Sequence, residues 1–199
     1  MIFAAAVFDF LDGFAARLLN AKSPIGAELD SLSDVVSFGV APSFIVAYLL
    51  NISDIEWMAG DINIFPMLAF ILAAFAAIRL AKFNIDTRQS SSFIGLPVPA
   101  VGLFIASLPF MVSKVEYGSV LFNLALNPYF LLAMVAIFSW LMISEVPFFS
   151  FKMKNLKFKE NILRYFVVIF AITAVVILQW VALPFVFLFY ILLSVVCYR

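Results

Sequence analysis

The chain has 199 residues, of which 66% are hydrophobic and only 12% charged, and its formal net charge at pH 7 is zero. A soluble domain is roughly 45–50% apolar, so this composition excludes an ordinary soluble protein and indicates one that is integral to a membrane. The single cysteine excludes an intramolecular disulfide framework, and the absence of histidine excludes Ser-His and His-metal chemistry.

Hydropathy divides the chain into about seven apolar segments, whereas a membrane-spanning helix needs about 20 apolar residues. The segments are residues 1–18, 25–50, 62–81, 97–113, 126–144, 161–180 and 183–198. No soluble domain or flexible linker interrupts them. The sequence therefore predicts an all-α, polytopic membrane bundle that forms a single domain over residues 1–199, with a motif at 9–34 and additional helices over 62–199.

Four aspartates occur within the first two apolar segments, where an ionised carboxylate costs several kcal/mol and is by default functional. They are Asp9, Asp12, Asp30 and Asp34. Asp9 and Asp12 are three residues apart, and Asp30 and Asp34 are four apart, so each pair shares one face of a helix. Two such faces turned toward each other form an all-oxygen pocket suited to Mg²⁺, Mn²⁺ or Ca²⁺. Four carboxylates can hold one ion, or two about 3.5–4 Å apart.

Three other residues of this stretch can contact a phosphate-bearing ligand. Gly13 has no side chain, so a phosphate or ribose can approach its backbone closely. Gly26 either admits a flat base or lets two helices pack. Arg17 offers a fork of donors to a diphosphate, or is a cation at the membrane interface. Glu28 lies on a different helix face from Asp30 and is a weaker candidate.

The loop charges predict the orientation of the bundle. If alternate loops are cytoplasmic, every lysine and arginine except Lys114 lies on that side, as positively charged loops usually do. This places the aspartates near the cytoplasmic face of a cell (inner) membrane. Residues 151–160 alternate basic and apolar side chains, which favours either contact with anionic lipids or a loop that only sets the topology.

The aspartate stretch resembles the signature of the membrane CDP-alcohol phosphotransferases. Its pattern is Asp9-x-x-Asp12-Gly13-x-x-Ala16-Arg17, eight residues, then Gly26-x-x-x-Asp30-x-x-x-Asp34. The resemblance implies that all four aspartates bind divalent metal, Mg²⁺ or Mn²⁺ and two ions in the family. It also implies that Asp34 is the catalytic base and that Asp12, Gly13, Arg17 and Gly26 bind the CDP group.

Three further stretches are similar to the phosphatidylserine synthase branch of this family. They are Asp34-Val-Val-Ser-Phe-Gly39, Arg79-Leu-Ala-Lys82-Phe-Asn84 and Gly95-Leu-Pro-Val-Pro-Ala100. Lys82 replaces the arginine usual in that branch, which keeps the charge but loses the bidentate fork. The resemblance implies transfer of a phosphatidyl group from CDP-diacylglycerol to L-serine, with release of CMP.

A serine acceptor needs a cation for its carboxylate, and Arg79 or Lys82, beside Asn84, is the candidate site. Both cations can instead simply mark the cytoplasmic end of a membrane span. Glycerol 3-phosphate and inositol phosphate are the alternative acceptors, although few arginines are available for their phosphate. A cation transporter is a more distant alternative, because intramembrane carboxylates also mark ion pathways.

The partners implied by this reading are membrane lipids and a second copy of the chain, since the family often forms homodimers. No nucleic-acid partner is expected. Only eight residues precede Asp9, whereas family members carry one more helix upstream. We therefore expect the chain to be truncated at its N-terminus.

Overall fold

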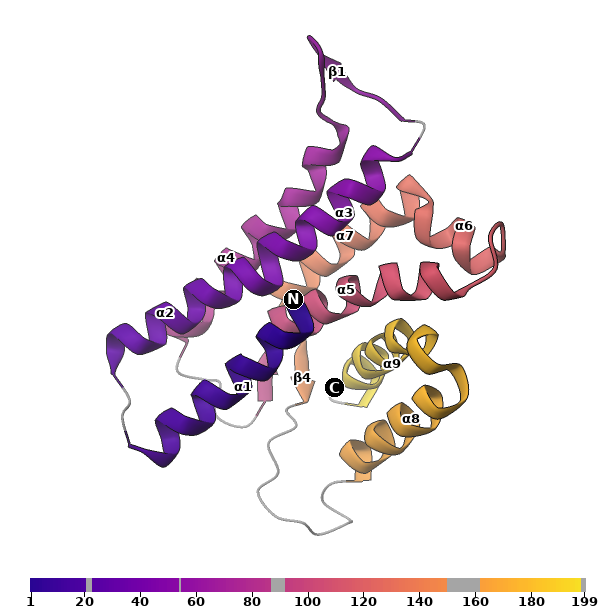
Figure 1. Cartoon of the computed structure of the whole chain (residues 1–199). Coiled ribbons are helices and arrows are strands. Elements are labelled where there is room, and N and C mark those ends of the chain that lie inside the picture. The colour runs from indigo at the N-terminus through magenta and orange to yellow at the C-terminus, as the bar shows by residue number, and fades with distance from the viewer. Residues whose placement is uncertain (21–22, 54, 87–91, 150–161, 198–199) are drawn as a thin grey trace.

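The computed structural model describes residues 1–20, 23–53, 55–86, 92–149 and 162–197, and most of them are helical (Figure 1). The α-helices are α1 (Ile2–Leu18), α2 (Pro24–Asp34), α3 (Ala41–Asn51), α4 (Ile71–Ile85), α5 (Val98–Lys114), α6 (Val120–Leu126), α7 (Pro128–Ile143), α8 (Ile162–Leu178) and α9 (Ala182–Cys197). The strands are β1 (Met58–Ala59), β2 (Ile62–Asn63), β3 (Ser92–Ile94) and β4 (Pro147–Phe149).

A π-helical stretch, Val35–Val40, joins α2 to α3, so that residues 24–51 form one long helix. The helix begins at Ser23, whose hydroxyl oxygen accepts a hydrogen bond from the backbone N–H of Gly26 at 3.1 Å. Proline follows at the first helical position, where its missing N–H does no harm. In the π-helical stretch the N–H of Ala41 bonds to the carbonyl of Val36, five residues back. Such insertions often occur at functional sites.

The first half of the core forms where this long helix meets α4 and α5. The antiparallel β1–β2 hairpin turns the chain back after α3, and a 3₁₀ stretch, Phe65–Phe70, leads into α4 beside it. Small residues allow the backbones to approach: a side chain at Gly39 would meet Ala76, and one at Gly102 would lie 2.9 Å from the Cα of Phe38. Phe38 is only 1% exposed as a result.

The second half of the core is built on α7 and α9, which pack against α4 and α5 respectively. A turn at Gly95 lies between β3 and α5, and its φ of +80° favours glycine. A side chain there would also overlap the carbonyl oxygen of Met142 at the end of α7. The β3–β4 pair holds the two ends together, with Phe93 opposite Phe148.

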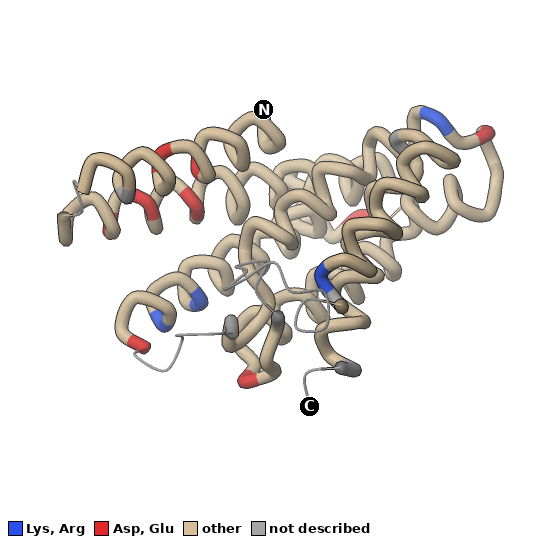
Figure 2. The backbone as a smooth tube through the Cα atoms, turned by 90° about the horizontal axis from the view of Figure 1, so that it is seen from below, with Lys and Arg blue, Asp and Glu red and all other residues tan. Residues whose placement is uncertain are grey.

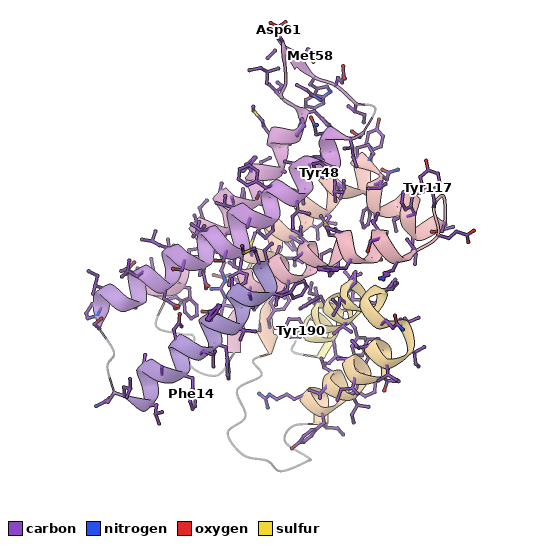
Figure 3. The ribbon with its side chains drawn as sticks, in the orientation of Figure 1. Phe14, Tyr48, Met58, Asp61, Tyr117 and Tyr190 are labelled. Atoms are coloured by element: carbon purple, nitrogen blue, oxygen red, sulfur yellow. The ribbon has the colours of Figure 1, made fainter. Side chains whose placement is uncertain are left out.

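Among the described residues, two helices are long and apolar enough to cross a membrane, 24–51 and 65–85. A third span results if α6 and α7, which are bent by 65° at Asn127, count as one. The helices α5, α8 and α9 are shorter and apolar. Each of the seven predicted segments contains helix among its described residues, but the structure does not confirm about seven membrane spans. Large apolar side chains such as Phe14 and Tyr48 project from the outer surface, as in a protein surrounded by lipid (Figure 3).

Two predictions lie outside the described residues. The basic stretch 151–160 is one, and the other is the contribution of Lys22 and Arg88 to the orientation of the bundle. Apolar helices of this kind are typical of a membrane protein. The membrane to which it belongs and the face that carries the aspartates remain predictions.

Candidate active site

Acidic residues gather where α1 and α2 run beside each other (Figure 2). Asp9 and Asp12 come from α1, and Asp30 comes from α2. One carboxylate oxygen of each lies within 4.8 Å of the others. The carboxyl groups of Asp9 and Asp30 are also within hydrogen-bonding reach of each other. The structure therefore brings together side chains that are 18 residues or more apart in the sequence.

Asp34 lies outside this group of three, one turn further along the same face of α2. It is half-buried and within electrostatic range of the other three aspartates and of Arg79 on α4. Asp34 is the last residue of α2, directly before the π-helical stretch. Asp34 therefore interacts both with the three carboxylates and with the cation on α4.

The donor set fits a hard divalent cation. Three carboxylates at this separation repel one another, and a cation with oxygen ligands would convert that repulsion into attraction. Carboxylate oxygens suit Mg²⁺ and Mn²⁺ equally, so the site does not identify the metal. The approach of Asp9, Asp12 and Asp30 is the observation that supports a metal site here.

The residues predicted to bind the CDP group lie around these carboxylates. A Cβ added at Gly13 would lie more than 4 Å from every described atom beyond its own helix and chain neighbours, so the space beside it is open. Gly26 lies in the first turn of α2, where the nearest atom to an added Cβ is the Ser23 hydroxyl oxygen, at 3.0 Å. The backbone of Arg17 belongs to α1, but its side chain lies outside the described part.

Arg79 is the buried cation of the site. It is 5% exposed, its guanidinium lies 4.9 Å from the centre of the Phe83 ring, and its Nε has no hydrogen-bond partner among the described residues. An unpartnered buried donor is costly. Tyr190 of α9, labelled in Figure 3, is within electrostatic range of the same guanidinium.

Arg79 and Lys82 line a hollow between α4 and the end of α7. The other lining residues are Asp86, Ile94, Met142, Ile143, Ser144 and Glu145. Lys82 donates a hydrogen bond from Nζ to the carbonyl oxygen of Ile143 at 3.2 Å. This bond satisfies one of the carbonyl groups that have no partner within the helix at the C-terminal end of α7. No sequence pattern predicts this side of the hollow, because residues 142–145 lie some sixty residues from Lys82 and carry no motif.

Asn84 does not line the hollow. Its side-chain Nδ2 donates to Glu28 Oε2 at 3.3 Å and to Ser31 Oγ at 3.0 Å, and both partners belong to α2. Ser31 had no predicted role, although its spacing of three residues from Glu28 puts the two on one face. Of the three predicted acceptor residues, two therefore share a cavity and the third contacts the helix that carries Asp30.

Comparison with known proteins gives consistent results. The model of the CDP-alcohol phosphatidyltransferase family matches residues 1–197. Proteins named CDP-diacylglycerol–serine O-phosphatidyltransferase are similar to the chain. One from Bacillus subtilis is 36% identical over 151 residues, which is 76% of this chain and 73% of the relative. One from Helicobacter pylori is 32% identical over 179 residues, 88% of this chain and 68% of the relative.

A third relative with the same name, from Methanocaldococcus jannaschii, is 40% identical over 121 residues, or 61% of this chain and 54% of the relative. Other relatives extend over the whole of this chain, as one from Mycobacterium leprae does at 32% identity. The chain thus spans between 54% and 73% of the length of these four proteins.

Proposed function

The chain belongs to the CDP-alcohol phosphatidyltransferase family, and from this premise we propose that it transfers a phosphatidyl group from CDP-diacylglycerol to L-serine. The observation that supports the proposal best is that Asp34 is within electrostatic range of both the three clustered carboxylates and the buried Arg79. A transferase needs a site for the phosphate groups and a site for the acceptor next to each other. Membership of this family sets the transporter alternative aside.

We assign the phosphate site to α1 and the start of α2. Asp9, Asp12 and Asp30, with Asp34 as a further ligand, would hold one or two divalent ions, which neutralise charge that develops on the departing phosphate. The open space beside Gly13 gives the diphosphate room to approach the backbone. Asp12, Arg17 and Gly26 complete the proposed CDP site.

We assign the acceptor site to the two cationic side chains of α4, Arg79 and Lys82. Arg79 is fixed by burial and by Phe83, and its Nε, which has no hydrogen-bond partner among the described residues, is suited to the carboxylate of serine. Lys82 at the same hollow supplies a second positive charge. Because Arg79 is within electrostatic range of Asp34, a serine held there would present its hydroxyl group close to that carboxylate.

The reaction is then a single displacement. Asp34 accepts the proton of the serine hydroxyl as its oxygen forms a bond to the phosphorus that carries the lipid. The bond between that phosphorus and the oxygen of CMP breaks, and CMP leaves with the electron pair. The serine proton thus passes to Asp34, the phosphatidyl group passes to the serine oxygen, and CMP carries away the electrons of the broken bond. We further propose that residues 1–199 act as one membrane domain, with the site near the cytoplasmic face, and that the protein is a homodimer.

The test is release of CMP from CDP-diacylglycerol in membranes that contain the chain. Serine, glycerol 3-phosphate and inositol phosphate are compared as acceptors, each with and without Mg²⁺ or Mn²⁺. We expect metal-dependent release with serine and its loss in Asp34→Asn. Asp61→Asn is the matched control, since Asp61 lies in the turn of the β1–β2 hairpin, at the far end of the molecule (Figure 3). Release with another acceptor alone would refute the serine assignment.

A further inference from the structure

The helix α2 carries two of the four aspartates but is weakly anchored. None of its residues is buried in the described structure. Because α2 has no buried face of its own, its rotation is set by its continuity with the packed π-helical stretch Val35–Val40 at one end and by polar contacts along its length. In the described part of the chain, the side-chain hydrogen bonds that join α2 to α4 all involve Asn84.

Asn84 contacts α2 at two residues, Glu28 and Ser31. The Asn84 amide nitrogen donates to Glu28 and to Ser31, and the Ser31 hydroxyl shares its single hydrogen between the Asn84 amide oxygen at 3.2 Å and the Ala27 carbonyl oxygen at 3.1 Å. Two contacts three residues apart on one helix restrict its rotation as well as its distance. Ser31 directly follows Asp30, so its face is about 100° round the helix from the aspartate face.

We propose that Asn84 is a positioning residue that fixes the rotation of α2, so that Asp30 stays opposite Asp9 and Asp12. This inference rests on the proposed function, because it gives the three carboxylates a common ligand to hold. It differs from the acceptor-binding role that the sequence predicted for Asn84. The hollow at Arg79 and Lys82, which Asn84 does not line, is consistent with the difference.

The sensitivity of the site follows from helix geometry. The ends of side chains lie about 5–6 Å from a helix axis, so a rotation of about 20° moves the Asp30 carboxylate by roughly 2 Å. Metal–ligand distances tolerate only about 0.2 Å. Loss of a restraint on rotation therefore weakens metal binding before it unfolds the helix.

The experiment uses the full chain in nanodiscs and compares the parent with Asn84→Ala, Ser31→Ala and the double variant. Asn123→Ala is the matched control, because Asn123 is also exposed and its side-chain amide donates to the Gly118 carbonyl, its one hydrogen-bond partner among the described residues, remote from the aspartates. Binding of Mn²⁺ is measured directly by electron paramagnetic resonance. Hydrogen–deuterium exchange of residues 24–34 is measured without metal, and the KM for serine is determined at saturating metal.

We expect Asn84→Ala to weaken Mn²⁺ binding about tenfold, at the lower end of the range for outer-shell partners. Exchange in α2 should rise, the KM for serine should stay the same, and activity should recover at high metal. The double variant should bind Mn²⁺ no more weakly than Asn84→Ala, since that single substitution already removes the contact with Ser31. Asn123→Ala should match the parent. Ser31→Ala provides the same test should Asn84→Ala fold poorly.

An increased KM for serine with unchanged Mn²⁺ binding would overturn the proposal and make Asn84 an acceptor contact. Unchanged Mn²⁺ binding and unchanged exchange would overturn it as well. Neither measurement of α2 depends on turnover. If the parent released no CMP with serine, the proposed function would fail while metal binding and exchange still decided the role of Asn84.

Discussion

Gly13→Ala separates the stability of the chain from its proposed activity, because the structure predicts effects of opposite sign. Glycine inside a helix costs about 1 kcal/mol relative to alanine. An added Cβ at position 13 would lie more than 4 Å from every described atom outside its own helix and chain neighbours. No steric cost offsets the gain in helix propensity. The free energy of unfolding should therefore rise by about 1 kcal/mol, equivalent to an increase in Tm of about 2–4 °C for a chain of this size.

The same methyl group would occupy the space assigned to the diphosphate. We expect the rate of CMP release to fall at least tenfold at low CDP-diacylglycerol, because a displacement of about 1 Å in a reacting geometry can cost 10²-fold. Thermal unfolding in detergent and initial rates over a range of CDP-diacylglycerol concentrations measure the two effects. A full rate in the stabilised variant would show that no ligand approaches Gly13.

Gly102→Ala is the matched control for this substitution. Its Cβ would lie 2.9 Å from the Cα of Phe38, an approach that real structures essentially never show. Overpacking of this kind costs typically about 1–3 kcal/mol. A decrease in Tm for Gly102→Ala together with an increase for Gly13→Ala would confirm that packing distinguishes the two glycines. A decrease for both would refute the reading of open space at Gly13.

Three further predictions concern the acceptor site, the turn before α5 and the metal. Arg79→Lys should raise the KM for serine about tenfold with little change in that for CDP-diacylglycerol, because lysine lacks the planar fork; an equal change in both would contradict an acceptor role. Gly95→Ala should strongly lower Tm and expression, because φ is +80° and the methyl group would overlap the Met142 carbonyl; a wild-type Tm would refute this. Chelation should abolish CMP release and lower Tm, and Mg²⁺ should restore both, since an ion that binds only the folded state stabilises it.

The helices were predictable because long apolar runs leave few alternatives. The predicted segment 25–50 is observed as residues 24–51, and 97–113 as Val98–Lys114. The bend at Asn127 had a signal, since Asn-Pro favours a turn, but hydropathy over residues 126–144 does not register it. The pairing of β3 with β4 had none, because it joins segments more than fifty residues apart.

The site shows the same division between local and long-range information. The spacing of Asp9 and Asp12, and of Asp30 and Asp34, was sufficient to predict two acidic helix faces, and the structure brings three of these side chains within 4.8 Å. The acceptor-binding role predicted for Asn84 rested on its neighbours in the sequence, Arg79 and Lys82. Its actual partners, Glu28 and Ser31, lie more than fifty residues away on another helix. The spacing of residues within one segment does not predict such a contact with another helix.

The π-helical stretch Val35–Val40 acts as a phase shift within one continuous helix. An α-helix advances about 100° per residue, and a π-helical insertion adds one residue without starting a new helix. The direction in which α2 points its aspartates is therefore shifted by about 100° relative to the direction in which α3 buries Val46 and Leu50. If the same residues formed a regular α-helix, the aspartates would turn about 100° away from α1 while the apolar span stayed intact. The chain would still enter the membrane, but its carboxylates would face in the wrong direction.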